Sequence, residues 1–146
     1  MTEQPFFSVV IPTYARPQQL AACLDALAAV DFARDRFEVV VSDDGSPESP
    51  EQRVAAMRDL LAVRLIRGAH SGPASARNRG AVNSRGRYLV FIDDDCLPTA
   101  GWLAALEQRF AELARYPLEQ LDHEIEIPRN LFSGGRFLRD AALALP

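Results

Sequence analysis

The chain has 146 residues, a net charge of −4, 48% hydrophobic residues and 25% charged residues. This length and balance fit a single domain with a substantial hydrophobic core. The acidic balance argues against a nucleic-acid binder, which would be basic. No apolar run approaches the roughly 20 residues that cross a bilayer, so we expect no transmembrane segment. The first residues also lack the basic start and apolar stretch of a signal peptide.

The two cysteines, Cys23 and Cys96, have neither the spacing of metal ligands nor that of a disulfide framework. Reduced thiols are the expectation for such a pair. Together with the missing signal peptide, this favours a cytoplasmic location. A peripheral place at the inner face of a membrane is left open.

Short apolar runs and apolar residues at helical spacing predict a regular succession of strands and helices. The predicted strands are 7–11, closed by Pro12, and then 37–41, 63–66 and 88–92. The predicted helices start at Pro17 and then cover 51–61, 73–84 and 101–116. The strand at 37–41 shows almost no alternation, so we expect it to be buried on both faces, which is typical of parallel sheets.

This order predicts an α/β fold with a doubly wound, mainly parallel sheet flanked by helices and joined by right-handed crossovers. Ligands of such sheets bind beyond the carboxyl ends of the strands. We expect residues 1–116 to form the core. Residues 117–146 are expected to form an irregular or helical extension of the same domain, with a short helix near 136–145.

Three consecutive carboxylates, Asp93, Asp94 and Asp95, follow the last predicted strand. Neighbouring carboxylates repel each other unless a positive group is bound. A divalent cation, Mn²⁺ or Mg²⁺, satisfies them and is commonly shared with substrate phosphates. Asp95, farthest from the sheet, is the expected direct ligand. A helix cap is the alternative, but a cap needs one acid and not three.

A second acidic strand end, Asp43 and Asp44, precedes a glycine. An Asp-Gly pair is also a common turn, so the pattern alone is ambiguous. Because both acidic groups fall at carboxyl ends of strands, we expect them to lie at one edge of the sheet and to bind a ligand together.

Basic and aromatic residues complete the predicted site. Arg77 lies among small residues, where its guanidinium suits a phosphate or a base carbonyl. Thr13, Tyr14 and Arg16 follow the first strand, and Tyr14 could stack on a base. We expect the other residues examined to be solvated surface groups: Arg79, Arg85, Arg87, His70 and His123.

Four segments in register resemble the family 2 glycosyltransferases, which have the GT-A fold. They are Ser-Val-Val-Ile-Pro-Thr-Tyr-Ala-Arg at 8–16, Val-Ser-Asp-Asp-Gly-Ser at 41–46, Gly-Pro-Ala-Ser-Ala-Arg-Asn-Arg-Gly at 72–80 and Gly-Arg-Tyr-Leu-Val-Phe-Ile-Asp-Asp-Asp at 86–95. Pro98 and Trp102 follow, so that the resemblance covers residues 6–113. It implies a metal-dependent, inverting transfer of a sugar from a nucleoside-diphosphate donor, commonly linked to UDP, to an acceptor hydroxyl.

The resemblance also implies a role for each matching residue. Thr13, Tyr14 and Arg16 would contact the nucleotide, Asp44 would bind the base, and Arg77 would help to hold the nucleotide. Asp43, beside Asp44, is included among the donor-binding residues. Asp95 would hold the metal, with Asp93 beside it, and Asp94 and Asp93 would lie near the ribose and the donor sugar.

The family's catalytic base belongs to an acidic motif in the second half of the domain, and no counterpart is found after residue 116. Arg139-Asp140 is only faintly similar to the segment before that motif. We therefore expect the chain to be short of a full catalytic domain, and the catalytic residue is not assigned. A nucleotide-sugar-binding module without catalysis is the alternative.

Two other classes fit less well. In haloacid dehalogenase-like phosphatases a Thr or Val stands two residues after the second aspartate, where this chain has Leu97. A NAD-binding domain would have Gly-x-Gly-x-x-Gly after the first strand. The sequence leaves the acceptor open among glycans, lipids and small molecules. An incomplete GT-A sheet would leave an open edge and an apolar face, so a homodimer is a further hypothesis.

Overall fold

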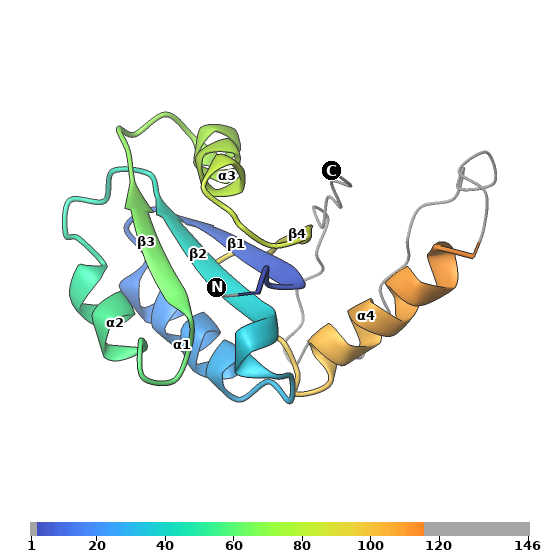
Figure 1. Ribbon diagram of the computed structural model, residues 1–146. Coiled ribbons are helices and arrows are strands. Elements are labelled where there is room, and N and C mark those ends of the chain that lie inside the picture. Colours follow the sequence, from blue (N-terminus) through green and yellow to red (C-terminus); the bar gives the residue numbers. More distant parts are fainter. Residues whose placement is uncertain (1–2, 116–146) are drawn as a thin grey trace.

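Residues 3–115 are described by the computed structural model, and they form a four-stranded parallel sheet between helices (Figure 1). The strand order is β3-β2-β1-β4. The strands are β1 (Phe7–Thr13), β2 (Phe37–Asp43), β3 (Val63–Arg67) and β4 (Tyr88–Phe91). The predicted α/β fold with a mainly parallel sheet is confirmed. Because the chain adds β2 and β3 on one side of β1 and β4 on the other, the topological switch lies between β1 and β4.

The helices alternate with the strands, as the apolar patterns predicted. They are α1 (Pro17–Ala28), α2 (Glu51–Ala56), α3 (Pro73–Val82) and α4 (Trp102–Leu113), with a 3₁₀ turn η1 (Arg34–Arg36) before β2. In Figure 1, α1 and α2 lie on one side of the sheet and α3 lies on the other. Both α1 and α3 have a proline in their first turn, where its missing N–H costs no hydrogen bond. No helix within residues 3–115 has the length and apolarity that a membrane span requires.

The hydrophobic core lies on the α1 side of the sheet. Alternate residues of β1, β2 and β4 face it, including Val9, Val39 and Val90, all of them at most 1% exposed. Leu24 of α1 and Trp102 of α4 fill the same core. The first helix, α1, and the last described helix, α4, therefore cover the same face of the sheet. This packing fixes the positions of the loops at the carboxyl edge.

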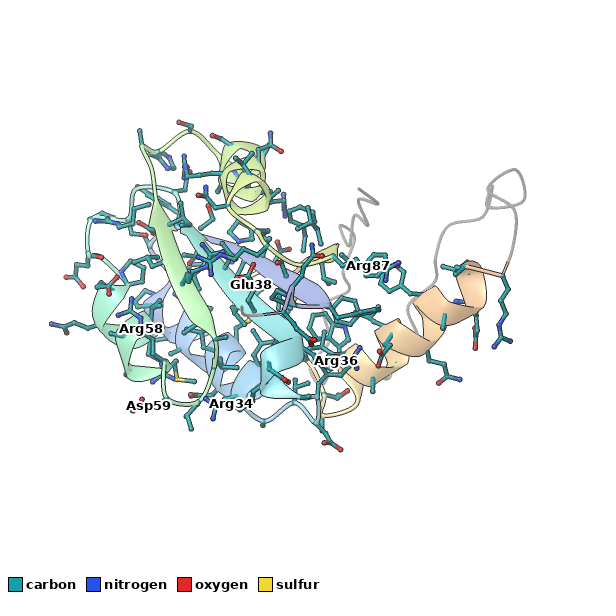
Figure 2. The ribbon with its side chains drawn as sticks, in the orientation of Figure 1. Arg34, Arg36, Glu38, Arg58, Asp59 and Arg87 are labelled. Carbon is teal, nitrogen blue, oxygen red and sulfur yellow. The ribbon has the colours of Figure 1, made fainter. Side chains whose placement is uncertain are left out.

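The opposite face of the sheet, under α3, is partly polar. Glu38 is buried there and accepts hydrogen bonds from the Ser8 hydroxyl at 2.7 Å, the Arg85 backbone N–H at 2.7 Å and Arg64 Nη2 at 3.0 Å. The Gly86 N–H donates in turn to the Ser8 hydroxyl at 2.7 Å. Glu38, labelled in Figure 2, lies over the middle of the sheet. This network ties the connection between α3 and β4 to the two central strands.

The α3 helix packs on the sheet at a glycine. A Cβ atom added to Gly80 would lie 2.4 Å from Val10 Cγ1 and 3.4 Å from Ser42 Cβ. Ala76, one turn earlier, is also fully buried. The small residues of the Ala-Arg-Asn-Arg-Gly segment thus let α3 approach β1 and β2 closely, and this approach sets the position of Arg77 at the carboxyl edge.

Gly80→Ala is expected to destabilise the protein by about 1–3 kcal/mol, because the methyl group overpacks the contact with Val10. This outweighs the gain of roughly 1 kcal/mol that alanine brings to a helix interior. Urea unfolding measures the loss. The matched control is Gly101→Ala before α4, where an added Cβ meets nothing within 4 Å. Equal stabilities of the two variants would contradict the close packing of α3.

Several element bounds differ from those predicted: at the site, β1 and β2 are longer, and β4 ends at Phe91, one residue earlier than predicted. β1 continues through Pro12 to Thr13, and β2 continues to Asp43. The Ile92 N–H, just beyond the end of β4, donates to the Val10 carbonyl oxygen. The nitrogen of Pro12, two residues after Val10, lies on the same side of β1, where β4 has already ended, so its missing N–H costs no hydrogen bond of the sheet. The helix predicted over 51–61 ends at Ala56 and continues as turns, so that Leu60 is 53% exposed.

The remaining predictions on organisation concern the end of the chain. The extension over 117–146, with its predicted short helix and His123, lies outside the described residues. The division into a core and an extension therefore stays a prediction.

Candidate functional site

A pocket of about 450 Å³ opens at the carboxyl ends of β1, β2 and β4, beside the first turn of α3. Its walls contain all of the sequence-predicted site residues except Asp43. The lining residues are Pro12, Thr13, Tyr14, Arg16, Asp44, His70, Pro73, Ala76, Arg77, Asp93, Asp94 and Asp95. The switch between β1 and β4 creates this pocket, because loops that leave neighbouring parallel strands in opposite directions leave a gap between them.

Asp94 forms the floor of the acidic cluster. Its side chain is 5% exposed, and it accepts hydrogen bonds from the Thr13 hydroxyl at 2.8 Å and from Arg16 Nη1 at 3.2 Å. Burial raises the pKa of Asp94, although the hydrogen bond from Thr13 and the charge of Arg16 oppose the shift. Asp94 therefore joins the loop after β4 to the turn after β1, a positioning role.

Asp93 and Asp95 are the accessible carboxylates of the cluster, with side chains 45% and 34% exposed. Asp93 Oδ1 pairs with Arg77 Nη2 at 2.8 Å. Asp95 Oδ2 lies 3.8 Å from Arg16 Nη1, beyond hydrogen-bond distance. In the turn after β4, Asp94 thus points inward at the floor of the pocket, and its two neighbours are more accessible.

These carboxylates fit a metal ion that is shared with a substrate. Within residues 3–115, no group of three or more His, Cys, Asp or Glu side chains is placed to hold an ion by itself. Mg²⁺ and similar ions in phosphate sites are commonly held by one or two carboxylates, with water and phosphate oxygens completing the shell. Asp95 and Asp93 can supply that pair, and Arg77 can supply charge for the phosphates.

Asp44 is held by the backbone of the loop before α3. Its Oδ1 accepts the Ser71 N–H at 2.9 Å and its Oδ2 accepts the Gly72 N–H at 2.9 Å. These bonds, that of Ser71 first, lower the pKa of Asp44 against the opposing effect of burial. Gly72 has φ 98°, which a residue with a side chain adopts only with strain. The carboxylate is therefore ionised and fixed at the pocket wall.

Asp43 does not line the pocket, contrary to the prediction that it binds the ligand. It is fully buried and accepts hydrogen bonds from the Ser46 hydroxyl and N–H and, at 2.9 Å, from Arg67 Nε. Asp43 is the last residue of β2, and because successive side chains along a strand point to opposite sides, it points away from the side on which Asp44 lies. Asp43 therefore fixes the Asp-Gly turn that presents Asp44.

Two residues that were expected to be solvated surface groups make contacts that the sequence did not predict. Arg79 was expected to be solvated, but it donates to the carbonyl oxygen of Asp43 at 3.2 Å and packs over Gly68. His70 is exposed, as expected, but it also lines the pocket and its ring stacks on Tyr14. No spacing rule signals either contact, because both depend on how the loop after β3 folds back.

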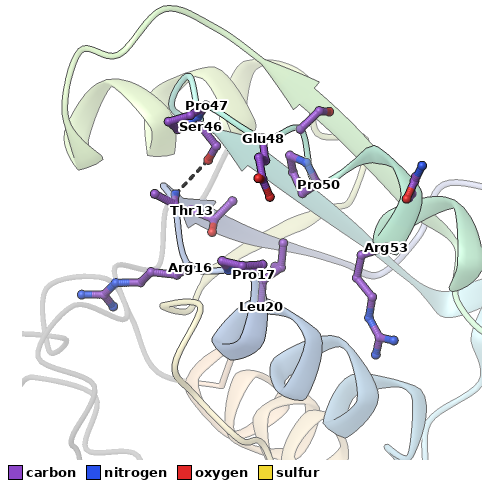
Figure 3. A pocket seen from close by; sticks show the side chains of 12 residues that line it. Thr13, Arg16, Pro17, Leu20, Ser46, Pro47, Glu48, Pro50 and Arg53 are labelled. Atoms are coloured by element: carbon purple, nitrogen blue, oxygen red, sulfur yellow. Dashed lines mark hydrogen bonds between the residues drawn. The ribbon is translucent and has the colours of Figure 1, made fainter.

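A second pocket, of about 480 Å³, lies beside the first, between the turn after β1 and the loop before α2 (Figure 3). Thr13 and Arg16 line both pockets. The Ala15 N–H donates to the Ser46 hydroxyl at 2.9 Å across this second pocket, as the dashed line in Figure 3 shows. Ala15 has φ 51°, so the turn that carries Arg16 is held in an unusual conformation by this bond.

Thr13→Val is expected to lower the free energy of unfolding by about 1–3 kcal/mol at neutral pH, because the buried Asp94 carboxylate loses a donor. The loss should shrink as the pH falls through the raised pKa of Asp94, since the protonated acid no longer carries a buried charge. Denaturant unfolding at several pH values measures it. Thr13→Ser keeps the hydroxyl and should stay close to wild type, and a pH-independent loss would point to packing instead.

Comparison with known proteins identifies the class. Residues 8–116 match the family described as Glycosyl transferase family 2, so the chain belongs to that family. Glycosyltransferase AglE of Haloferax volcanii is 34% identical over 102 residues, which are 68% of this chain and 33% of that protein. The chain therefore spans about a third of the length of this relative.

Solved structures agree with the fold. The structure of TarS 1–349 from Staphylococcus aureus in complex with UDP-GlcNAc has a TM-score of 0.65 and 30% identity, covering 75% of this chain and 31% of that one. The mannosyltransferase PcManGT from Pyrobaculum calidifontis, in complex with GDP-Man and Mn²⁺, has a TM-score of 0.61 and 30% identity, covering 70% and 33%. The sheet and helices described above are therefore those of GT-A glycosyltransferases.

Proposed function

We propose that the pocket binds a nucleoside-diphosphate sugar together with Mn²⁺ or Mg²⁺, and that the chain is the donor-binding part of an inverting glycosyltransferase. The observation that carries this proposal is the meeting of accessible carboxylates, guanidinium groups and an aromatic ring in one pocket at the topological switch. The membership in glycosyl transferase family 2 supports it.

Each part of the donor has a chemically suitable place. Tyr14, 41% exposed, offers a ring on which a base can stack, and Asp44 lies beside it as an ionised acceptor. Asp95 and Asp93 would hold the metal, and Arg77 would contact the diphosphate. When bound, the metal would neutralise charge on the diphosphate and so make it a better leaving group.

UDP is the donor nucleotide that we propose first. The bound UDP-GlcNAc of TarS supports this choice, and the bound GDP-Man of PcManGT makes GDP the comparison to test. Both nucleotides present a ring that can stack on Tyr14 and a diphosphate that can bind the metal held by the acidic cluster. Contacts to the base edge must therefore decide between them.

The proposed transfer forms a bond between an acceptor oxygen and the anomeric carbon while the bond to the diphosphate breaks. A general base must take the proton of the acceptor hydroxyl. The pocket carboxylates of residues 3–115 are engaged in holding loops or, as we propose, the metal. We therefore assign the base outside this segment, and the acceptor, whether glycan, lipid or small molecule, stays open.

Isothermal titration with UDP and with GDP, each with and without Mn²⁺, tests donor binding directly. We expect UDP to bind in the presence of Mn²⁺ and to bind much more weakly after chelation. Absence of binding of either nucleotide under both conditions would overturn the proposal. A non-catalytic binding module is the second candidate, and it predicts binding without release of UDP from UDP-GlcNAc in the presence or absence of acceptors.

The cellular setting belongs to the same proposal. Cys23 and Cys96 are both free thiols, which supports a cytoplasmic location. Burial raises the pKa of both, that of Cys96 to about 11, so they are poor nucleophiles. A homodimer remains a hypothesis, and sedimentation at high concentration tests it.

A further inference from the structure

We propose that His70 occupies the nucleobase position of this pocket and must leave Tyr14 before a nucleotide can bind. This inference rests on the proposed function, because it concerns the residue that controls entry to the same pocket. In this proposal His70 competes with the base for the Tyr14 ring and so lowers the affinity for the nucleotide, whereas the sequence indicated only a surface residue.

The first observation is the ring contact. The centroids of the His70 and Tyr14 rings are 4.1 Å apart with an interplanar angle of 28°, a stacked arrangement. A nucleobase that stacks on Tyr14 needs the same separation from that ring. The face of Tyr14 that His70 covers is therefore closed to a base while the two rings are in contact.

The second observation is the contact with Asp44. His70 Nδ1 lies 2.9 Å from Asp44 Oδ2 and 3.1 Å from the Asp44 carbonyl oxygen. Each carboxylate oxygen of Asp44 already accepts a backbone N–H, from Ser71 or Gly72. The imidazole thus lies against the carboxylate of Asp44 while its hydrogen bond goes to the carbonyl oxygen, and it crowds the side of Asp44 to which a base N–H would donate. One side chain covers both a stacking surface and the approach to an acceptor.

The third observation is that His70 is held by little else. Its side chain is 60% exposed, and it belongs to the loop between β3 and α3, at the edge of the molecule in Figure 1. Asp44, by contrast, is buried and fixed by the loop backbone. A rotation of the His70 side chain alone can therefore free the position, and the loop need not move.

The affinity test uses His70→Ala with two probes, UDP and inorganic pyrophosphate, each with Mn²⁺. Removal of the competing ring is expected to tighten UDP binding roughly two- to tenfold, the range of one aromatic stacking contact. Pyrophosphate binding should not change, because that probe has no base. Unchanged or weaker UDP binding would overturn the inference, as would a parallel change for pyrophosphate, which would indicate an effect on the loop as a whole.

A second measurement does not depend on affinity. The chain has two histidines, so the imidazole resonances can be assigned with a His123→Gln variant. In the free protein the His70 signal should carry a ring-current shift that Tyr14→Leu abolishes. Saturation with UDP and Mg²⁺, which is diamagnetic and does not broaden the resonance, should move the wild-type signal toward its position in Tyr14→Leu.

The outcomes separate the two proposals. If UDP binds and the His70 signal does not move, the role of His70 is overturned and the proposed function stands. If no nucleotide binds either wild type or His70→Ala, the proposed function fails. A missing ring-current shift in the free protein would by itself overturn the stacked starting state.

Discussion

Asp95→Asn is expected to weaken UDP binding in the presence of Mn²⁺ by roughly a hundredfold or more, because outer-shell partners of a metal already contribute 10–100-fold. The substitution keeps the size of the side chain but removes the charge of the proposed direct ligand. Within residues 3–115, Asp95 makes no hydrogen bond to a charged partner, since Arg16 Nη1 lies 3.8 Å away. The fold should therefore be unaffected, and the melting temperature should stay at the wild-type value.

The control for this result is Asp25→Asn on α1. Asp25 is a carboxylate with a side chain 65% exposed, paired with Arg53 and outside both pockets. It should bind UDP as wild type does. Titration with UDP, with Mn²⁺ and after chelation, gives the comparison. If Asp95→Asn retains the full response to Mn²⁺, Asp95 is not the metal ligand, and Asp93→Asn becomes the next variant.

Glu38→Ala is expected to be the most destabilising of the substitutions considered, with a loss of about 3–5 kcal/mol in the free energy of unfolding. It removes the buried partner of a partly buried ion pair, leaving Arg64 without its carboxylate. It also leaves the Ser8 hydroxyl and the Arg85 N–H without their acceptor. Urea unfolding measures the loss, and Glu38→Gln, which keeps an acceptor oxygen, should lose less.

The pH dependence distinguishes this network from simple packing. Burial alone would raise the pKa of Glu38, but the hydrogen bonds from Ser8, Arg85 and Arg64 outweigh it and lower the pKa below 4.5. A lowered pKa in the folded state adds stability that is fully present above the unfolded pKa and is lost as the pH falls through the folded one. The difference between wild type and Glu38→Ala should therefore be constant near neutral pH and shrink below about pH 4. A difference that persists at pH 2 would show that the loss comes from packing.

A structural link connects this network to the site. Glu38 fixes the connection that follows α3, whereas Gly80 lets α3 lie directly on β1 and β2. The first turn of that helix carries Pro73 and leads to Arg77 at the pocket. At the other end of the sheet, Arg36, which is labelled in Figure 2, pairs with Glu107 of α4. Its guanidinium also lies over the Phe6 and Phe32 rings. Contacts far from the pocket thus set the frame in which its side chains meet.

The sequence by itself determined the order of strands and helices, the parallel sheet and the family. Each of these depends on local information: apolar runs, the spacing of helical stripes and four short segments such as Phe91-Ile92-Asp93-Asp94-Asp95. The position of Asp44 and the acidic cluster at one edge also followed, because the carboxyl ends of parallel strands must lie together.

Only the tertiary structure decided which side chains face the pocket. Asp43 and Asp44 are neighbours and both are buried, yet the first pairs with Arg67 away from the pocket and the second lines the pocket wall. Asp94 likewise turns inward to Thr13, while Asp95 stays accessible. The contact between His70 and Tyr14 joins two loops that are distant in the sequence. Such contacts depend on backbone direction and loop closure in three dimensions, which residue type and spacing do not encode.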